Sequence, residues 1–232
     1  MKRVLLKMLA ASSLLLGLSL SGVGHAADLI VAKPDAAKGE QLFTNGDPSR
    51  GVLACVSCHG DGGNSMVPAN PNLAGQAHEY IAKQLHDFQA KKGAKPARLG
   101  AGGNNSVMTA IATPLTDEDI ANVAYYLGQQ ALNYDKAGTA TKEATMERGQ
   151  HIWRAGIAER EVPACAACHA ANGKGIPALF PRLAGQFPSY IETQLKLFRS
   201  NERGNSEIMH TIADRMSDSD IAAVADYAAG LR

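Results

Sequence analysis

The 232-residue sequence is poor in aromatic residues, in cysteine and in net charge. Aromatic side chains make up 5% of the chain, and four cysteines are too few for a disulfide scaffold of this length. A formal net charge of +1 excludes a chain that is basic throughout, as a nucleic-acid-binding protein would be. The 45% hydrophobic content excludes a disordered polyelectrolyte, and the length suffices for one large domain or for two of about 100 residues.

After residue 26, no segment has 18 consecutive apolar residues. Before it, three basic residues precede an apolar segment from Met8 to about Val23, and small residues stand at the −3 and −1 positions of a cut after Ala26. An uncleaved membrane anchor is the alternative, but serine and glycine interrupt the segment, which would span a bilayer poorly. The sequence therefore predicts a cleaved secretory signal peptide at residues 1–26, export to the periplasm, and a mature chain without a transmembrane helix.

The rest of the sequence repeats itself. Residues 55–59, Cys-Val-Ser-Cys-His, return 110 residues later as Cys-Ala-Ala-Cys-His at 165–169, and their surroundings return at the same offset. The first half then carries nine extra residues, after which the register resumes at an offset of 101. A period this long indicates two tandem domains rather than a solenoid. We predict an N-terminal domain at residues 27–132, a polar linker at 133–145 and a C-terminal domain at 146–232.

Each half shows the pattern of an all-α domain. Thr116 is a typical N-cap, three acidic residues follow it, and apolar residues from Ile120 to Leu127 then recur with helical spacing. Ser217 begins the same pattern in the second half. We also expect a middle helix around residues 81–88 and 191–198, and a first helix at about 36–45 and 146–155. No run alternates apolar and polar residues for long enough to predict a sheet.

The chemistry is concentrated in the two Cys-x-x-Cys-His motifs. Two cysteines at this spacing can form thioethers with the two vinyl groups of one haem, and the following histidine is then held as an axial ligand of the iron. A redox disulfide would need a βαβ context, and one zinc site would need both pairs together, whereas the duplicated surroundings indicate that each pair serves its own half. We predict two covalently attached haem c groups. The attachment residues are Cys55, Cys58, Cys165 and Cys168, and the axial ligands are His59 and His169.

Met108 and Met209 are the candidates for the second axial ligand of each iron. They occupy matched positions in a polar loop that we expect shortly before the last helix of each half. A single methionine is more often a core residue, but the match between the halves favours ligation. Met66 has no methionine counterpart, and we expect it to lie in a loop or to pack against other side chains.

These features resemble class I cytochrome c domains, and the tandem pair resembles the dihaem cytochrome c4 family over nearly all of residues 34–232. The resemblance implies that a proline carbonyl twelve residues after each histidine, at Pro71 and Pro181, accepts a hydrogen bond from the ring and orients it. It also implies that Leu73 and Leu183 press against the porphyrins.

Other positions acquire roles from the same resemblance. Gly39 and Phe43 are expected to cross Tyr126 on the last helix of the first half, and Gly149 and Trp153 to cross Tyr227 in the second. Further pocket candidates, at the haem edges or propionates, are Gln76, Gln186, Tyr80 and Tyr190.

The implied function is that of a carrier rather than an enzyme. Two irons with His and Met ligands have no open position, which suits single-electron transfer. The family resemblance implies passage of electrons from a quinol-oxidising respiratory complex to a terminal oxidase or reductase, with possible association with membrane complexes and no role for nucleic acid. The alternatives are a haem subunit of a larger dehydrogenase, such as a sulfide-oxidising flavocytochrome, and a dihaem peroxidase. The basic cluster at Lys91, Lys92, Lys95 and Arg98 is either a docking patch for an acidic partner or a solvated loop.

Overall fold

The computed structural model describes residues 33–91 and 94–232, so the predicted signal peptide at residues 1–26 lies outside the described residues. Within that part the chain is helical, and its only β-type pairings are isolated bridges. The prediction of an all-α fold is confirmed. None of the described helices is both long enough and apolar enough to cross a membrane.

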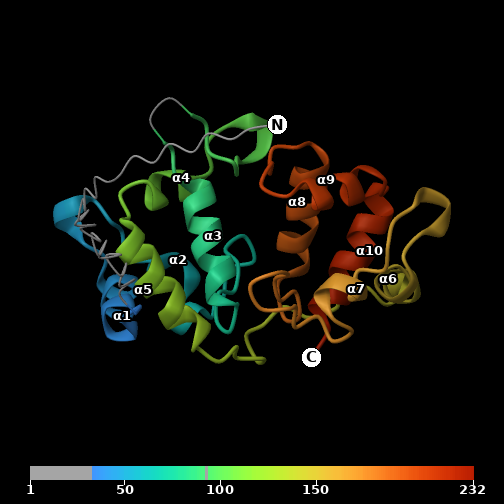
Figure 1. Ribbon diagram of the computed structural model, residues 1–232. Coiled ribbons are helices and arrows are strands. Elements are labelled where there is room, and N and C mark those ends of the chain that lie inside the picture. Colours follow the sequence, from blue (N-terminus) through green and yellow to red (C-terminus); the bar gives the residue numbers. More distant parts are fainter. Residues whose placement is uncertain (1–32, 92–93) are drawn as a thin grey trace, which may run out of the picture. The chain divides into compact units, whose positions relative to one another are not determined.

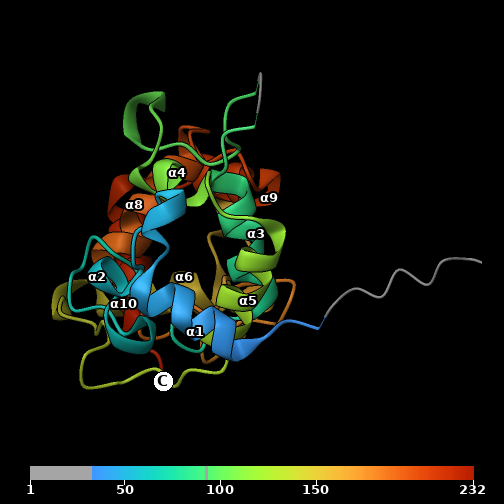
Figure 2. The ribbon, with the colours of Figure 1, turned by 90° about the vertical axis from the view of Figure 1, so that its left-hand side faces the viewer.

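Three longer helices frame the first half of the chain. They are α1 (Ala36–Asn45), α3 (His78–Phe88) and α5 (Asp117–Gly128). Two short helices, α2 (Val56–His59) and α4 (Val107–Ala112), lie between them in sequence. Helix α5 packs against both α1 and α3, and its place beside α3 is visible in Figures 1 and 2.

The second half repeats this arrangement. Its longer helices are α6 (Glu143–Ala155), α8 (Pro188–Arg199) and α10 (Asp218–Ala229), with α7 (Ala166–His169) and α9 (Glu207–Asp214) as the shorter ones. Helix α10 packs against α6 and α8, as α5 packs against α1 and α3 (Figure 1).

Helices α5 and α10 begin where the sequence predicts. The Thr116 hydroxyl accepts a hydrogen bond from the backbone N–H of Asp119, whose carboxylate accepts one from the N–H of Thr116. Ser217 and Asp220 form the same capping box at the start of α10. Each box satisfies backbone donors that a helix leaves unpaired at its N-terminus, so the cap fixes the helix start locally.

A close helix crossing depends on one glycine in each half. A Cβ atom on Gly39 would lie 2.1 Å from the backbone oxygen of Asn122 in α5, and one on Gly149 would lie 2.3 Å from the backbone oxygen of Ala223 in α10. Only glycine allows the two helices to approach this closely. In the first half the close crossing also brings Phe43 into contact with Tyr126, with ring centroids 5.7 Å apart, as expected from the family resemblance.

Each half has its own hydrophobic cluster. Phe43, Ile120 and Leu127 are among the most buried residues of the first, and Trp153 and Ile221 of the second. Two separate clusters are what two tandem domains require, since each domain must bury its own helix faces.

The segment between the halves is bonded to the second half. Asp226, which is 1% exposed, accepts hydrogen bonds of 3.0 Å from the backbone N–H groups of Thr141 and Lys142. The N–H of Gly138 donates to the carbonyl of Gly185 at 2.9 Å. Hydrogen bonds therefore hold this segment against the second half at Gly138, Thr141 and Lys142.

Candidate haem-binding sites

One cavity of about 1090 Å³ is lined by all but one of the haem-site residues predicted from the sequence. It is lined mostly by apolar side chains and includes both motif histidines and both matched methionines. It also includes the proline, leucine, glutamine and tyrosine pairs predicted for the pockets. Of the predicted site residues, Cys168 alone is not part of the lining; the residues present are Cys55, Cys58, His59, Pro71, Leu73, Gln76, Tyr80, Met108, Cys165, His169, Pro181, Leu183, Gln186, Tyr190 and Met209.

The two cysteines of each motif share one helical turn. Cys55 precedes α2 in the helical conformation and Cys58 lies within it, so a spacing of three residues puts both on one side of the turn. The backbone N–H of His59 donates to the carbonyl of Cys55 at 3.0 Å, which holds the histidine at the end of the same turn. Residues 165–169 have the same geometry in α7. None of the four cysteines, all of which lie in the described part of the chain, is in a disulfide. Burial raises the pKa of the Cys55 and Cys165 thiols to about 11.

The histidine rings are oriented by backbone carbonyls. His59 Nδ1 lies 3.0 Å from the carbonyl oxygen of Pro71, and His169 Nδ1 lies 2.9 Å from that of Pro181. A carbonyl can only accept, so Nδ1 carries the hydrogen in each ring and Nε2 keeps the lone pair that a metal requires.

Burial favours the neutral form of both rings. His59 is 6% exposed and His169 is 7% exposed. Burial lowers the pKa of both imidazoles, and the hydrogen bond to the proline carbonyl opposes this effect in each case. The neutral imidazole is the form that binds a metal.

Met108 and Met209 lie in the first turns of α4 and α9, not in a loop as the sequence suggested. Ser106 and Ser206 are the N-caps, and their hydroxyls accept from the backbone N–H of the methionine at 3.2 and 3.4 Å. Helix α4 has only six residues, too few to show a clear apolar period in the sequence. Met66 is 74% exposed, in keeping with its predicted place in a loop.

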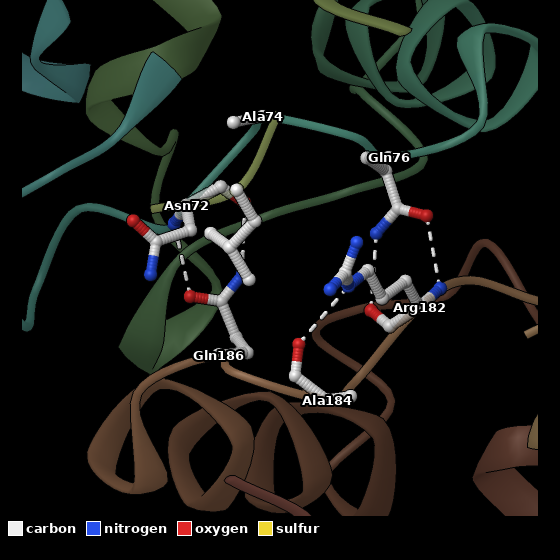
Figure 3. Close-up of a pocket in the computed structure, with 7 residues that line it drawn as sticks. Asn72, Ala74, Gln76, Arg182, Ala184 and Gln186 are labelled. Carbon is white, nitrogen blue, oxygen red and sulfur yellow. Dashed lines mark hydrogen bonds between the residues drawn. The ribbon is translucent and has the colours of Figure 1, made fainter. Parts of the chain in front are cut away.

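The glutamine and tyrosine candidates line the cavity but have polar partners in the opposite half. Tyr80 accepts a hydrogen bond from Arg203, and Tyr190 accepts one from Arg98. Gln76 is bonded to the backbone of Arg182, as Figure 3 shows. Gln186 is bonded in the same way to the backbone of Asn72.

Sequence reasoning missed the importance of two arginines. The sequence places Arg98 in a basic cluster, yet Arg98 is 6% exposed, whereas Lys91 and Lys95 lie at the surface. Arg203 is 4% exposed. The two do not correspond under either offset of the repeat, because the nine extra residues fall between the matched segments. The repeat therefore gave no signal for them.

The residues present fit two haem groups. The cavity supplies large apolar surface, a histidine with a free Nε2 in each half, a methionine sulfur in each half and thiols beside each histidine. This is the donor set of a low-spin c-type haem, duplicated. The fold and the sites together define a tandem c-type cytochrome.

Comparisons with known proteins agree with this class. The profile of the family described as Cytochrome c matches residues 36–131 and 146–231. Cytochrome c4 of Azotobacter vinelandii is 37% identical over 227 residues, covering 96% of this chain and 98% of the relative. The thiosulfate dehydrogenase electron acceptor of Stutzerimonas stutzeri (strain A1501) is 37% identical over 211 residues, covering 90% and 93%. Reduced recombinant cytochrome c4 from Pseudomonas stutzeri has a solved structure that matches with a TM-score of 0.71 and 32% identity, covering 86% of this chain and 100% of that one.

The chain belongs to the cytochrome c family, as a tandem protein of the cytochrome c4 type. Cytochrome c domains carry covalently attached haem c, and two copies fit the two domains. The protein is thus a dihaem electron carrier.

Proposed function

We propose that this protein carries single electrons in the periplasm, from a quinol-oxidising respiratory complex to a terminal oxidase or reductase. Its signal peptide is residues 1–26, and the haem domains are residues 27–132 and 146–232, joined by the linker 133–145. Cys55 and Cys58 attach one haem c, and Cys165 and Cys168 attach the other. The axial pairs are His59 with Met108 and His169 with Met209.

The observation that carries this proposal is the matched His and Met pair beside each thiol pair in one apolar cavity. Bound haem supplies one-electron redox chemistry at its iron. The chain supplies two protein ligands for each iron, which leaves no position for a substrate and suits electron transfer. A methionine sulfur as the second ligand also raises the reduction potential, as an acceptor of quinol-derived electrons requires.

Rapid-mixing kinetics with the purified holoprotein test the route. Reduction is followed with a solubilised quinol-oxidising complex, and reoxidation with a terminal oxidase or reductase. We expect both steps to be fast and to slow as ionic strength rises, because weak redox partners associate by charge steering. Failure of both partners to exchange electrons with the protein would overturn the route. Sequencing of the mature N-terminus in a periplasmic extract tests export, with Ala27 expected first.

One relative favours a second candidate function, in which the protein accepts electrons from a different donor. The thiosulfate dehydrogenase electron acceptor of Stutzerimonas stutzeri covers 90% of this chain. In this case the electron donor would be a thiosulfate-oxidising enzyme rather than a quinol-oxidising complex. The same mixing experiment with a thiosulfate dehydrogenase separates the two donors: fast reduction by the dehydrogenase and none by the quinol-oxidising complex would favour the second role.

A further inference from the structure

His210 connects the helix that carries Met209 to the helix before it in the chain. It follows Met209 directly in α9, which packs against α8 (Figure 1). His210 Nδ1 lies 2.7 Å from the carbonyl oxygen of Phe198. A carbonyl can only accept, so Nδ1–H donates this hydrogen bond. The residue beside a predicted iron ligand is thus bonded to the backbone of α8.

The carbonyl of Phe198 is a fixed point in the second half. It lies in the last turn of α8 and also accepts from the backbone N–H of Asn201 at 3.0 Å. Phe198 is 7% exposed and lines the cavity, so packing holds this end of the helix in place. A side chain that bonds to this carbonyl therefore holds α9 at a defined position beside the cavity.

Other contacts of the two methionine helices are of the same kind in both halves. Both helices begin at a serine cap. Just after α4, the carbonyl of Leu115 accepts from Gln89 Nε2 at 2.8 Å. The equivalent carbonyl of Met216 accepts from Arg199, the counterpart of Gln89 in the repeat, at 3.3 Å. The two halves therefore hold the far end of the methionine helix in a similar way.

The position directly after the methionine differs between the halves. Thr109 occupies the place of His210 in the first half. Thr109 is 4% exposed, and its hydroxyl has no hydrogen-bond partner among the residues that the structure describes. It therefore makes no bond to the carbonyl of Phe88, the counterpart of Phe198 in the repeat. Within the described part of the chain, only the second methionine has a neighbour whose side chain is bonded to the preceding helix.

The structure separates the position of His210 from that of a ligand. Among the described residues, Met209 lines the cavity and His210 does not. The ring of His210 is bonded instead to the end of α8 through Nδ1. In this arrangement His210 acts on the backbone next to Met209 and does not compete with its sulfur for a metal.

Given an iron bound by Met209, as the proposed function requires, we infer that His210 is a positioning residue that holds this sulfur in place. Its hydrogen bond to Phe198 lowers the fraction of molecules in which Met209 moves away and leaves its ligand position open. A competing ligand that needs the open form binds more weakly in proportion to that fraction. The haem at Met209 is therefore protected against small competing ligands, and the haem at Met108 is the one that opens more readily.

Titration of the oxidised, exported full-length holoprotein with imidazole tests this inference. Imidazole competes with methionine for the iron, so each replacement removes half of the far-red sulfur-to-iron absorption. In the wild type we expect two steps, with Met108 replaced at the lower imidazole concentration. The Met108→Ala protein assigns the steps, because its remaining absorption comes from Met209.

The variant His210→Phe keeps an aromatic ring and removes the donor. The net contribution of one hydrogen bond corresponds to a factor of about three to ten, so we expect imidazole to replace Met209 at a concentration lower by about that factor. The step at Met108 stays unchanged. His210→Asn restores the wild-type behaviour, because its amide nitrogen is as many bonds from the backbone as Nδ1 and can donate to Phe198.

Two further variants complete the series. His151→Phe is the matched control, because it removes an exposed histidine from α6 of the same half, and it leaves both steps unchanged. His210→Thr copies the residue of the first half and replaces His210→Phe if that variant does not fold. We expect the same shift of the Met209 step. A general loss of stability would move both steps, so a shift of one step alone identifies a positioning role.

The outcomes separate this inference from the proposed function. Far-red absorption for fewer than two methionine-bound haems in the wild type would overturn the proposed ligand pairs. Absorption for two, with the Met209 step of His210→Phe and His210→Thr equal to that of His151→Phe, would overturn the role of His210 alone. The same conclusion would follow if imidazole replaced Met209 before Met108 in the wild type, or if His210→Asn behaved like His210→Phe.

Discussion

Gln76 and Arg182 form a closed pair of hydrogen bonds between the two halves of the chain. Gln76 Nε2 donates to the carbonyl of Arg182 at 3.1 Å, and Gln76 Oε1 accepts from the backbone N–H of Arg182 at 2.9 Å (Figure 3). Gln186 forms the same pair with the backbone of Asn72, at 3.0 and 2.9 Å. Positions 72 and 182, and 76 and 186, are equivalents of the 110-residue repeat. The contact is therefore self-complementary, as in a two-fold dimer, although both halves belong to one chain.

The variants Gln76→Ala and Gln186→Ala are expected to destabilise the holoprotein. Each removes one side chain and leaves a backbone N–H and a carbonyl without partners, which costs about 1–3 kcal/mol per buried unsatisfied group. The larger loss is expected for Gln186→Ala, because the Asn72 groups are buried and the Arg182 groups only partly so. Equilibrium urea unfolding measures the loss. Gln129→Ala is the control, because the Gln129 amide is exposed and bonds within its own helix. Equal stability of the two interface variants and the control would contradict an energetic role for this contact.

Gly39→Ala is expected to disrupt the crossing of α1 and α5. The new Cβ would meet the backbone oxygen of Asn122 at 2.1 Å, and a backbone atom cannot turn aside as a flexible side chain can. Overpacking of this kind costs about 1–3 kcal/mol, and more where the neighbouring atoms are backbone and cannot move. Gly100→Ala, where the nearest atom would lie at 3.5 Å and φ is −93°, serves as the control. The midpoint of thermal unfolding is measured for both variants, and we expect it to be lower for Gly39→Ala. A Gly39→Ala protein as stable as Gly100→Ala would contradict the close approach of α1 and α5.

Acid should weaken the second half through Asp220. This carboxylate is 3% exposed; burial acts to raise its pKa, but hydrogen bonds from Ser217, Arg160 and Arg148 outweigh burial and lower it. A lowered pKa in the folded state gives stability that is fully present above the unfolded value of about 3.9. That stability is lost as pH falls below that value towards the folded pKa.

The comparison of wild type with Asp220→Asn measures this contribution. At pH 7 the variant is expected to be less stable by about 1–3 kcal/mol, because the asparagine amide cannot pair as an ion with Arg148 and Arg160. The two free energies of unfolding then converge as pH falls below about 4. Asp135→Asn, at an exposed position, controls for a general change of charge. If the free energies of unfolding of wild type and Asp220→Asn differ by the same amount at pH 7 and below pH 4, the ionised Asp220 carboxylate does not stabilise the fold.

Replacement of either predicted sulfur ligand should remove half of the far-red sulfur-to-iron charge-transfer absorption of the oxidised protein. Met108→Ala and Met209→Ala each take away one thioether and lower the potential of one haem, because methionine ligation raises it. Met66→Ala is the control, since Met66 is 74% exposed. Full absorption in either ligand variant would show that another side chain holds that iron.

Local features of the sequence predicted local features of the structure. The helix starts at Thr116 and Ser217 follow from capping residues within three positions of each other, and the haem motifs are complete within five residues. Helix α4 cannot be predicted from the sequence because six residues show too little apolar periodicity, so the sequence predicts a loop at Met108.

The sequence by itself determined the two repeated helical domains and the two haem attachment motifs, because each depends on the spacing of residues that lie close together in the chain. The tertiary structure decided what Gln76, Gln186, Arg98 and Arg203 contact. Their partners lie about 100 residues away, and hydrogen bonding or burial of a polar side chain depends on which surface meets it in the folded chain. Arg98 illustrates the difference: a basic run predicts a solvated surface, whereas packing against Phe88 and α8 buries this arginine in the cavity that both domains share.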